Sequence, residues 1–197
     1  MSKERLKSPR VRLFVALDLP EALREGIVAW GRRELRDPGL RVVSSQSLHI
    51  TLAFLGYLPE KEIGRLGGIV ETVRGPAPSV ELGDPVARPS PRRARLFALP
   101  AKSPGAVSLR VELEEALVGE RLYKPEKRPF WAHVTVARVK SRERGSGCPA
   151  KVERPPGGLP GALLQPAICR RLSLYRSELS PQGARYARLA QVELSNQ

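Results

Sequence analysis

The hydrophobic pattern divides the chain into two halves of similar order. Short apolar runs rich in β-branched residues predict strands at residues 11–17, 48–55, 95–99 and 131–139. Apolar residues at helical spacing predict helices at residues 20–36, 60–73 and 106–117. Weaker patterns add strands at residues 42–43, 80–82, 167–175 and 184–194. Each half therefore places a helix after an early strand and a second strong strand further on.

Such a duplicated strand–helix–strand unit indicates an α+β fold. We expect two lobes whose antiparallel sheets line a central cleft, with the helices outside. The predicted domain covers residues 11–194 and follows a basic N-terminal tail, residues 1–10. A basic insertion rich in Gly and Pro, near residues 140–160, interrupts the second half.

The chain contains two histidines, and both lie in the same short motif on a predicted strand. His49 begins His-Ile-Thr-Leu-Ala, and His133 begins His-Val-Thr-Val-Ala, 84 positions later (133 minus 49). Alternate side chains of a strand share a face, so each imidazole should lie beside Thr51 or Thr135 and the Ala two residues on. One isolated motif of this kind fits a structural histidine, but the matched pair favours catalysis.

Two imidazoles and two hydroxyl groups suit the cleavage of a phosphodiester. The free imidazole pKa of about 6.5 lets one ring accept a proton and the other donate one near neutral pH. Threonine hydroxyls can bind the phosphate oxygens. In-line attack at phosphorus needs a base at the entering oxygen and an acid at the leaving oxygen. This chemistry requires no cofactor and no metal.

The composition indicates which kinds of partner and which compartment fit the protein. The formal net charge is +14, which indicates an anionic partner such as RNA or, alternatively, an Arg-rich solvated surface. No apolar run approaches the roughly 20 residues that span a bilayer, and no signal peptide is evident. We therefore expect a cytoplasmic monomer that does not bind membranes. Cys148 and Cys169 lack metal-site spacing and are expected to be free thiols.

The two motifs and their flanks resemble the paired signatures of two-histidine phosphoesterases. The strand Arg12-Leu13-Phe14-Val15-Ala16-Leu17-Asp18 and the segment Leu174-Tyr175-Arg176-Ser177-Glu178 are similar to the opening and closing segments of that family. The most similar group is the RNA 2',3'-cyclic phosphodiesterases, also named 2'-5' RNA ligases. The chain departs from many relatives at Ala132, where they have Pro.

The resemblance implies hydrolysis of a terminal RNA 2',3'-cyclic phosphate to a 2'-phosphate, with His133 as the proton acceptor and His49 as the proton donor. Some relatives also join tRNA halves through a 2'-5' linkage, so tRNA fragments are candidate partners. It further implies phosphate contacts by Thr51 and Thr135, and base or nucleotide contacts by Phe54 and Arg138. Strict alternation nevertheless places Phe54 and Arg138 on the face opposite the histidines, so a bulge or the strand end would have to turn them.

Three alternatives stay open on the sequence alone. The enzyme could act instead on 2'-5' oligonucleotides or on small cyclic nucleotides. The chain could also be an RNA-binding module without turnover, although the intact His and Thr pairs argue against this. The basic clusters at residues 88–95 and 140–144 fit either RNA contacts or solvated loops.

Overall fold

The computed structural model describes residues 9–142, 147–180 and 183–195. Most of the predicted basic tail and four residues of the basic insertion, 143–146, lie outside the described residues. Three α-helices are present in the described chain: α1 (Glu21–Glu34), α2 (Ile63–Thr72) and α3 (Pro104–Gly119). The strands of this part of the chain are β1 (Arg10–Asp18), β2 (Leu40–Val42), β3 (His49–Pro59), β4 (Ser79–Leu82), β5 (Val86–Arg88), β6 (Leu96–Lys102), β7 (His133–Val139), β8 (Ala167–Ile168), β9 (Arg171–Ser180) and β10 (Gly183–Glu193).

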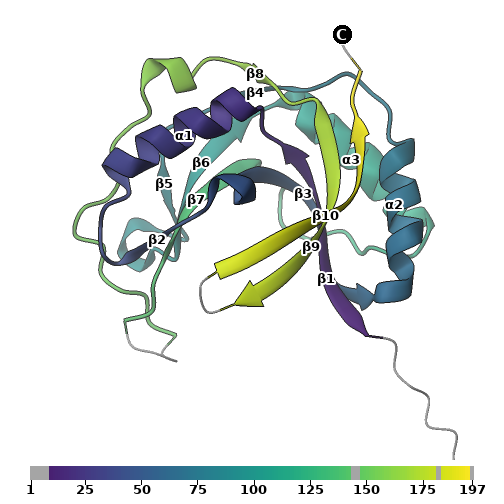
Figure 1. The fold of residues 1–197 in the computed structure, drawn as a ribbon, viewed down its shortest axis with the longest axis horizontal. Coiled ribbons are helices and arrows are strands. Elements are labelled where there is room, and N and C mark those ends of the chain that lie inside the picture. Colours follow the sequence, from purple (N-terminus) through teal and green to yellow (C-terminus); the bar gives the residue numbers. More distant parts are fainter. Residues whose placement is uncertain (1–8, 143–146, 181–182, 196–197) are drawn as a thin grey trace, which may run out of the picture.

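The strands form one curled antiparallel sheet with the order β10-β9-β1-β3-β7-β6-β4-β8, while β2 pairs with β7 and β5 with β6. Figure 1 shows α1 on one side of the molecule and α2 with α3 on the other. The predicted α+β class, with antiparallel strands and outer helices, is confirmed. The two halves meet where Ile50 of β3 pairs with Val134 of β7. Because each residue directly follows a histidine, this pair marks a pseudo-two-fold axis between the halves.

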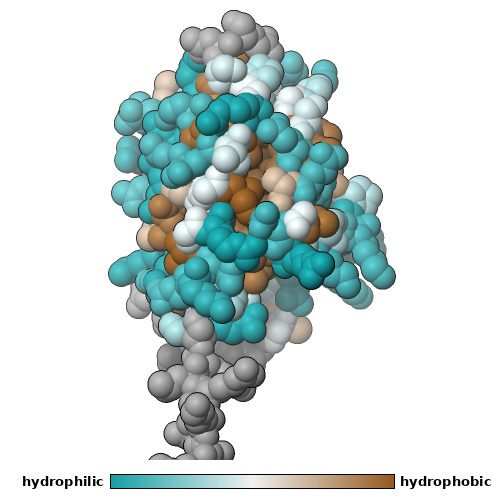
Figure 2. Space-filling view, turned by 90° about the vertical axis from the view of Figure 1, so that its right-hand side faces the viewer, coloured by the Kyte–Doolittle hydropathy of each residue, from teal (hydrophilic) through white to brown (hydrophobic). Residues whose placement is uncertain are grey.

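One continuous core holds the helices against the sheet. Strand β1 contributes Leu13 and Val15, both fully buried, and α3 contributes Leu113 and Leu117. Helix α3 begins where Ser103 accepts a hydrogen bond from the Ala106 amide (3.2 Å), with Pro104 in its first turn. Figure 2 shows the side of the molecule that carries α2, where hydrophilic residues surround a few apolar ones. The helices thus bury one face each, as their spacing predicted.

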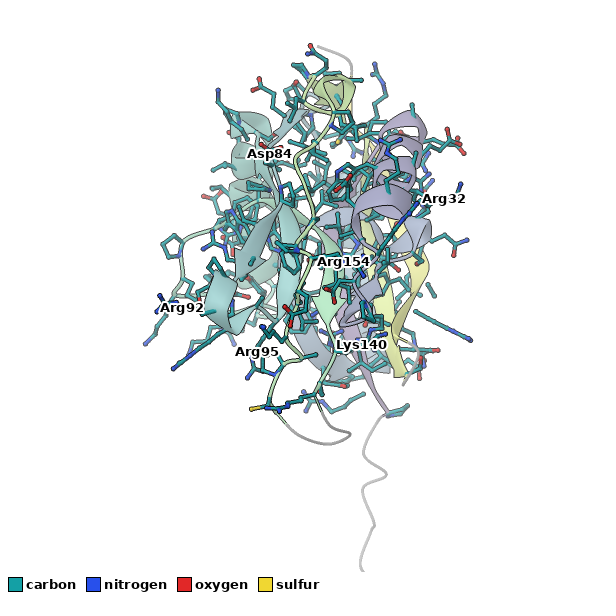
Figure 3. All side chains as sticks on the ribbon, turned by 90° about the vertical axis from the view of Figure 1, so that its left-hand side faces the viewer. Arg32, Asp84, Arg92, Arg95, Lys140 and Arg154 are labelled. Carbon is teal, nitrogen blue, oxygen red and sulfur yellow. The ribbon has the colours of Figure 1, made fainter. Side chains whose placement is uncertain are left out.

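The second part of the basic insertion, residues 147–160, runs as an extended segment between α1 and strands β5 and β6 (Figure 3). Buried Asp37 anchors it, because one carboxylate oxygen accepts hydrogen bonds from the amides of Glu153 (2.8 Å) and Arg154 (2.9 Å). These backbone hydrogen bonds, chiefly that from Arg154, lower the pKa of Asp37 although burial opposes the shift. The Leu159 amide donates to Asp84 (2.8 Å). Residues 147–160 of the predicted loop are therefore fixed to the domain.

The structure differs from the predicted strands in two places. The predicted strand at 167–175 is divided into β8 and β9, because the chain leaves β4 at Cys169 and Arg170 before it pairs with β1. Strand β5 was not predicted, since its three residues lie between Pro85 and Pro89 in a Pro-rich stretch. Pairing with β6 orders these residues despite their weak pattern.

Candidate active site

Both histidine motifs open into one small pocket. The antiparallel contact between β3 and β7 brings the two His-x-Thr segments side by side. A pocket of about 170 Å³ lies over them, and we name it the histidine pocket. Its walls are Arg12, Phe14, Val43, Ser47, His49, Thr51, Phe54, Leu96, His133, Thr135, Arg138 and Tyr186. All six residues that the sequence analysis assigned to the site therefore lie at one place.

A β-bulge in each motif strand decides which side chains reach this pocket. In β3, Thr51 pairs with Ala16 and Ala53 with Val15, so Leu52 has no partner of its own in β1. An extra residue of this kind shifts the alternation of every side chain that follows it. Ala53 is consequently buried in the core, whereas Phe54 is exposed and lines the histidine pocket.

The bulge in β7 is the counterpart of that in β3. Thr135 pairs with Ala98 and Ala137 with Phe97, so Val136 is the extra residue. Ala137 is fully buried, and Arg138 is exposed at the pocket. The predicted placement of the two motif alanines beside the histidines is therefore wrong. The same bulges turn Phe54 and Arg138 onto the histidine face.

The His133 ring is held by the segment that precedes β7. Its Nδ1 lies 2.7 Å from the carbonyl oxygen of Trp131, and the Trp131 ring stacks on the imidazole at 4.1 Å between centroids. The Arg88 guanidinium of β5 also lies over the Trp131 ring, at 4.1 Å. Burial lowers the pKa of His133, and the positive charges of Arg88 and Arg138 lower it further, against the hydrogen bond to Trp131.

The His49 ring is partly buried among aromatic side chains of strands β1 and β10. Phe14 of β1 stacks on it at 4.9 Å, and Tyr186 of β10 meets it edge-on at 5.4 Å. Its Nε2 is 3.2 Å from the Thr51 hydroxyl. Burial lowers the pKa of His49 to about 4, and the positive charges of His133 and Arg138 act in the same direction, whereas a backbone hydrogen bond with Ser47 opposes them.

Several site residues were missed by sequence reasoning. Arg12 donates to the Ser177 hydroxyl (2.7 Å) and lies over the Phe54 ring at 4.6 Å. Arg12 and Phe14 alternate with the core residues of β1, so their shared face was the available signal. Arg88 was noted only as part of the basic cluster at residues 88–95, because it belongs to a strand that the pattern did not predict.

The structure also bears on metal binding, on the two cysteines and on membrane-spanning helices. Among the described residues, no three His, Cys, Asp or Glu side chains are grouped as a metal ion requires. Cys148 and Cys169 are both unpaired thiols, the first exposed and the second buried. None of the helices in the part of the chain that the structure describes has the length and apolarity to cross a membrane.

Comparison with known proteins gives a consistent result. The family model for LigT-like phosphoesterases matches residues 17–97. The RNA 2',3'-cyclic phosphodiesterase of Methanothermobacter thermautotrophicus is 30% identical over 90% of this chain and 95% of its own length. The enzyme of the same name from Thermus thermophilus is 32% identical, covering 93% and 90%. A crystal structure of a Thermus thermophilus protein superimposes with a TM-score of 0.76 at 28% identity, covering 94% of this chain and 98% of that one. The chain therefore belongs to the family of LigT-like phosphoesterases.

Proposed function

We propose that this protein hydrolyses 2',3'-cyclic phosphate ends of RNA to 2'-phosphates, using its two histidines and no metal ion. The observation that carries the proposal is the convergence of two imidazoles and two Thr hydroxyls in the histidine pocket. The relatives named RNA 2',3'-cyclic phosphodiesterase support the choice of substrate.

His133 is suited to be the base. A hydrogen on Nδ1 is donated to the Trp131 carbonyl, so Nε2 keeps a lone pair. Burial and neighbouring cations lower the pKa of His133, so the ring is neutral at pH 7. It accepts a proton from water as the water oxygen forms a bond to phosphorus. The bond from phosphorus to the 3' oxygen then breaks.

His49 then donates a proton to the departing 3' oxygen, which leaves a 3'-hydroxyl and a 2'-phosphate. A pKa of about 4 makes this ring neutral in the free protein at pH 7. The acid role therefore requires that the bound phosphate raises the pKa of His49. An anion placed beside an imidazole has this effect, because it stabilises the charged ring.

Four further side chains hold the substrate. The hydroxyls of Thr51 and Thr135 donate to the non-bridging phosphate oxygens, where negative charge accumulates in the transition state. Phe54 and Arg138 lie at the rim of the same pocket and contact the terminal nucleoside by stacking and by charge.

The same site suits a ligation reaction, in which another nucleophile replaces water. If the 5'-hydroxyl of a second RNA takes the place of water, the attack on the cyclic phosphate forms a 2'-5' linkage, and tRNA fragments with such ends are suitable partners. Hydrolysis and ligation use the same two proton transfers, so one pair of histidines serves both.

The first test is turnover of a 2',3'-cyclic-phosphate-ended oligonucleotide in EDTA. We expect a 2'-phosphate product by ³¹P NMR, and a loss of about 10²- to 10⁴-fold in kcat for His49→Ala and for His133→Ala. Arg33→Gln, an exposed change on α1, serves as the control. A 3'-phosphate product, or full activity of either His variant, would contradict the proposal.

A second test separates the two histidine roles. The substrate carries sulfur in place of the bridging 3' oxygen, because a thiolate leaves without a proton. Such a substrate should restore turnover by His49→Ala but not by His133→Ala. Rescue of His133→Ala alone would reverse the assignment.

A further inference from the structure

A larger groove adjoins the histidine pocket on its His133 side. Its volume is about 600 Å³, and it lies between β3, the edge formed by β5 and β6, and the segment that joins α3 to β7. We name it the Trp131 groove. Its lining includes the aromatic residues Phe54, Tyr123, Phe130 and Trp131 and the cations Arg88, Arg95, Arg110 and Arg128.

The groove and the histidine pocket are continuous. Thr51, Phe54, Leu96 and His133 line both. The histidine pocket alone, at about 170 Å³, is smaller than the roughly 300 Å³ at the low end of small-molecule sites. It therefore has room for the cyclic phosphate and part of the ribose. The rest of an RNA chain, which is attached through the 5' oxygen of that ribose, must lie outside it.

Charge in the groove suits a polyanion. Arg110 is already neutralised by Glu114, at 2.7 Å. Within the described ranges, Arg88, Arg95 and Arg128 form no ion pair with a carboxylate. Glu126 is the one acidic residue of the groove lining. Arg95, which also donates to the Gly147 carbonyl (3.3 Å), and Arg128 thus remain available for phosphates, and Arg88 for a base.

A chain of contacts leads from the catalytic base into the groove. The Trp131 ring stacks on His133 at 4.1 Å, and the Arg88 guanidinium lies over the Trp131 ring, also at 4.1 Å. Two side chains therefore already pack on Trp131, which we assign as a wall of the groove. Arg88 is exposed, and RNA-binding proteins stack bases on guanidinium planes.

We propose that the Trp131 groove binds the nucleotides on the 5' side of the cyclic phosphate, with a base stacked on Arg88 and phosphates bound by Arg95 and Arg128. The inference rests on the proposed function and specifies its substrate class. The preferred substrate is an oligonucleotide of several nucleotides, whereas a mononucleotide cyclic phosphate leaves the groove empty.

The opposite exit from the histidine pocket is less suitable. A pocket of about 120 Å³ adjoins it there, lined by Arg41, Ser44, Arg138 and Tyr186 among others. This space is one fifth of the Trp131 groove, and its only aromatic ring, Tyr186, already packs against His49. A substitution of Arg41 therefore tests whether RNA leaves the pocket by this exit.

The test compares kcat/KM for a mononucleotide 2',3'-cyclic phosphate with that for oligonucleotides of two to six nucleotides bearing the same end. Each stacked base contributes about 1–3 kcal/mol, so we expect kcat/KM to rise roughly tenfold or more with the first added nucleotides. Each phosphate contact adds about 0.7 to the negative salt slope for single strands, so the two contacts of Arg95 and Arg128 should steepen it by about 1.4.

Variants locate the effect. Arg88→Lys keeps the positive charge but removes the planar guanidinium on which a base would stack. Arg128→Gln removes the positive charge. Both should lower the ratio of oligonucleotide to mononucleotide kcat/KM, by about fivefold or more. Arg33→Gln on α1 is the matched control, and Arg41→Gln tests the opposite exit. The ratio removes any effect that Arg88 exerts through His133, because such an effect reaches both substrates.

The outcomes separate the two proposals. A ratio near one for the wild type, or a ratio lowered by Arg41→Gln but not by the groove variants, would overturn the inference and leave the phosphodiesterase activity standing. If no substrate is turned over, the proposed function fails. The groove is then judged by binding of a 2'-phosphate-ended oligonucleotide against a nucleoside 2'-phosphate, where equal affinities would overturn the inference.

Discussion

The protonation of His49 gives the most direct check on the catalytic assignment. Burial beside Phe14 lowers its pKa from 6.5 to about 4, so only about one ring in a thousand is protonated at pH 7 in the free protein. An anion bound about 4 Å away, at an effective dielectric constant near 20, stabilises the imidazolium by about 4 kcal/mol. At 1.36 kcal/mol per pKa unit, the pKa of His49 should rise by about three units, to near 7.

Imidazole ¹⁵N NMR measures this directly, because the chain has only two histidines. His49→Gln and His133→Gln assign the two ring signals. Sulfate is the probe, since it is tetrahedral and its charge is constant over the titrated range. The reasoning would be refuted by a His49 signal that titrates near 6.5 in the free protein, or by one whose midpoint moves less than one unit when sulfate saturates the site.

Stability and catalysis give three further tests of the structure. Because the folded-state pKa of His49 is lowered, its neutral form contributes fully to stability above pH 6.5 and this contribution is lost as pH falls toward 4. Urea unfolding should therefore show about 2 kcal/mol less stability at pH 4.5 than at pH 7, and His49→Gln should reduce that difference. Asp37→Asn places an amide where a carboxylate oxygen accepts a hydrogen bond from the Glu153 amide. The free energy of unfolding should fall by about 2 kcal/mol, and a protease should cut faster near residue 153. An unchanged cleavage rate would show that Asp37 does not anchor the segment. Thr51→Val and Thr135→Val should each lower kcat by about 10²-fold with a smaller change in KM, whereas a pure KM effect would place the hydroxyls in ground-state binding only.

The doubled motif could be recognised in the sequence because it depends only on the spacing of neighbouring residues. His49 and His133 are the two histidines of the chain, and each begins the same five-residue motif. The apolar periodicity of the flanking residues predicted that both lie on strands. The helices at residues 20–36 and 106–117 were likewise predicted close to α1 and α3, since each buries a face of period 3.6. The fold class follows from that duplication, whereas the pairing of the two motif strands was seen only in the structure.

Tertiary structure alone decided which neighbours face the reacting atoms. Side chains alternate between the two faces of a strand only until a β-bulge. At a bulge, two residues of one strand lie opposite one residue of the partner strand. Strand β1 imposes it at Leu52 and β6 at Val136, and this turns Phe54 and Arg138 into the pocket.

The same limit applies to the electrostatics of the site. The lowered pKa of His49 comes from burial against Phe14, and that of His133 from burial and from Arg88. These residues are distant in sequence from the motifs that they modify. The sequence by itself determined the chemistry that the strands carry. Packing between remote segments determined the protonation state in which that chemistry starts and the groove through which a substrate reaches it, because burial and charge proximity exist only once the chain is folded.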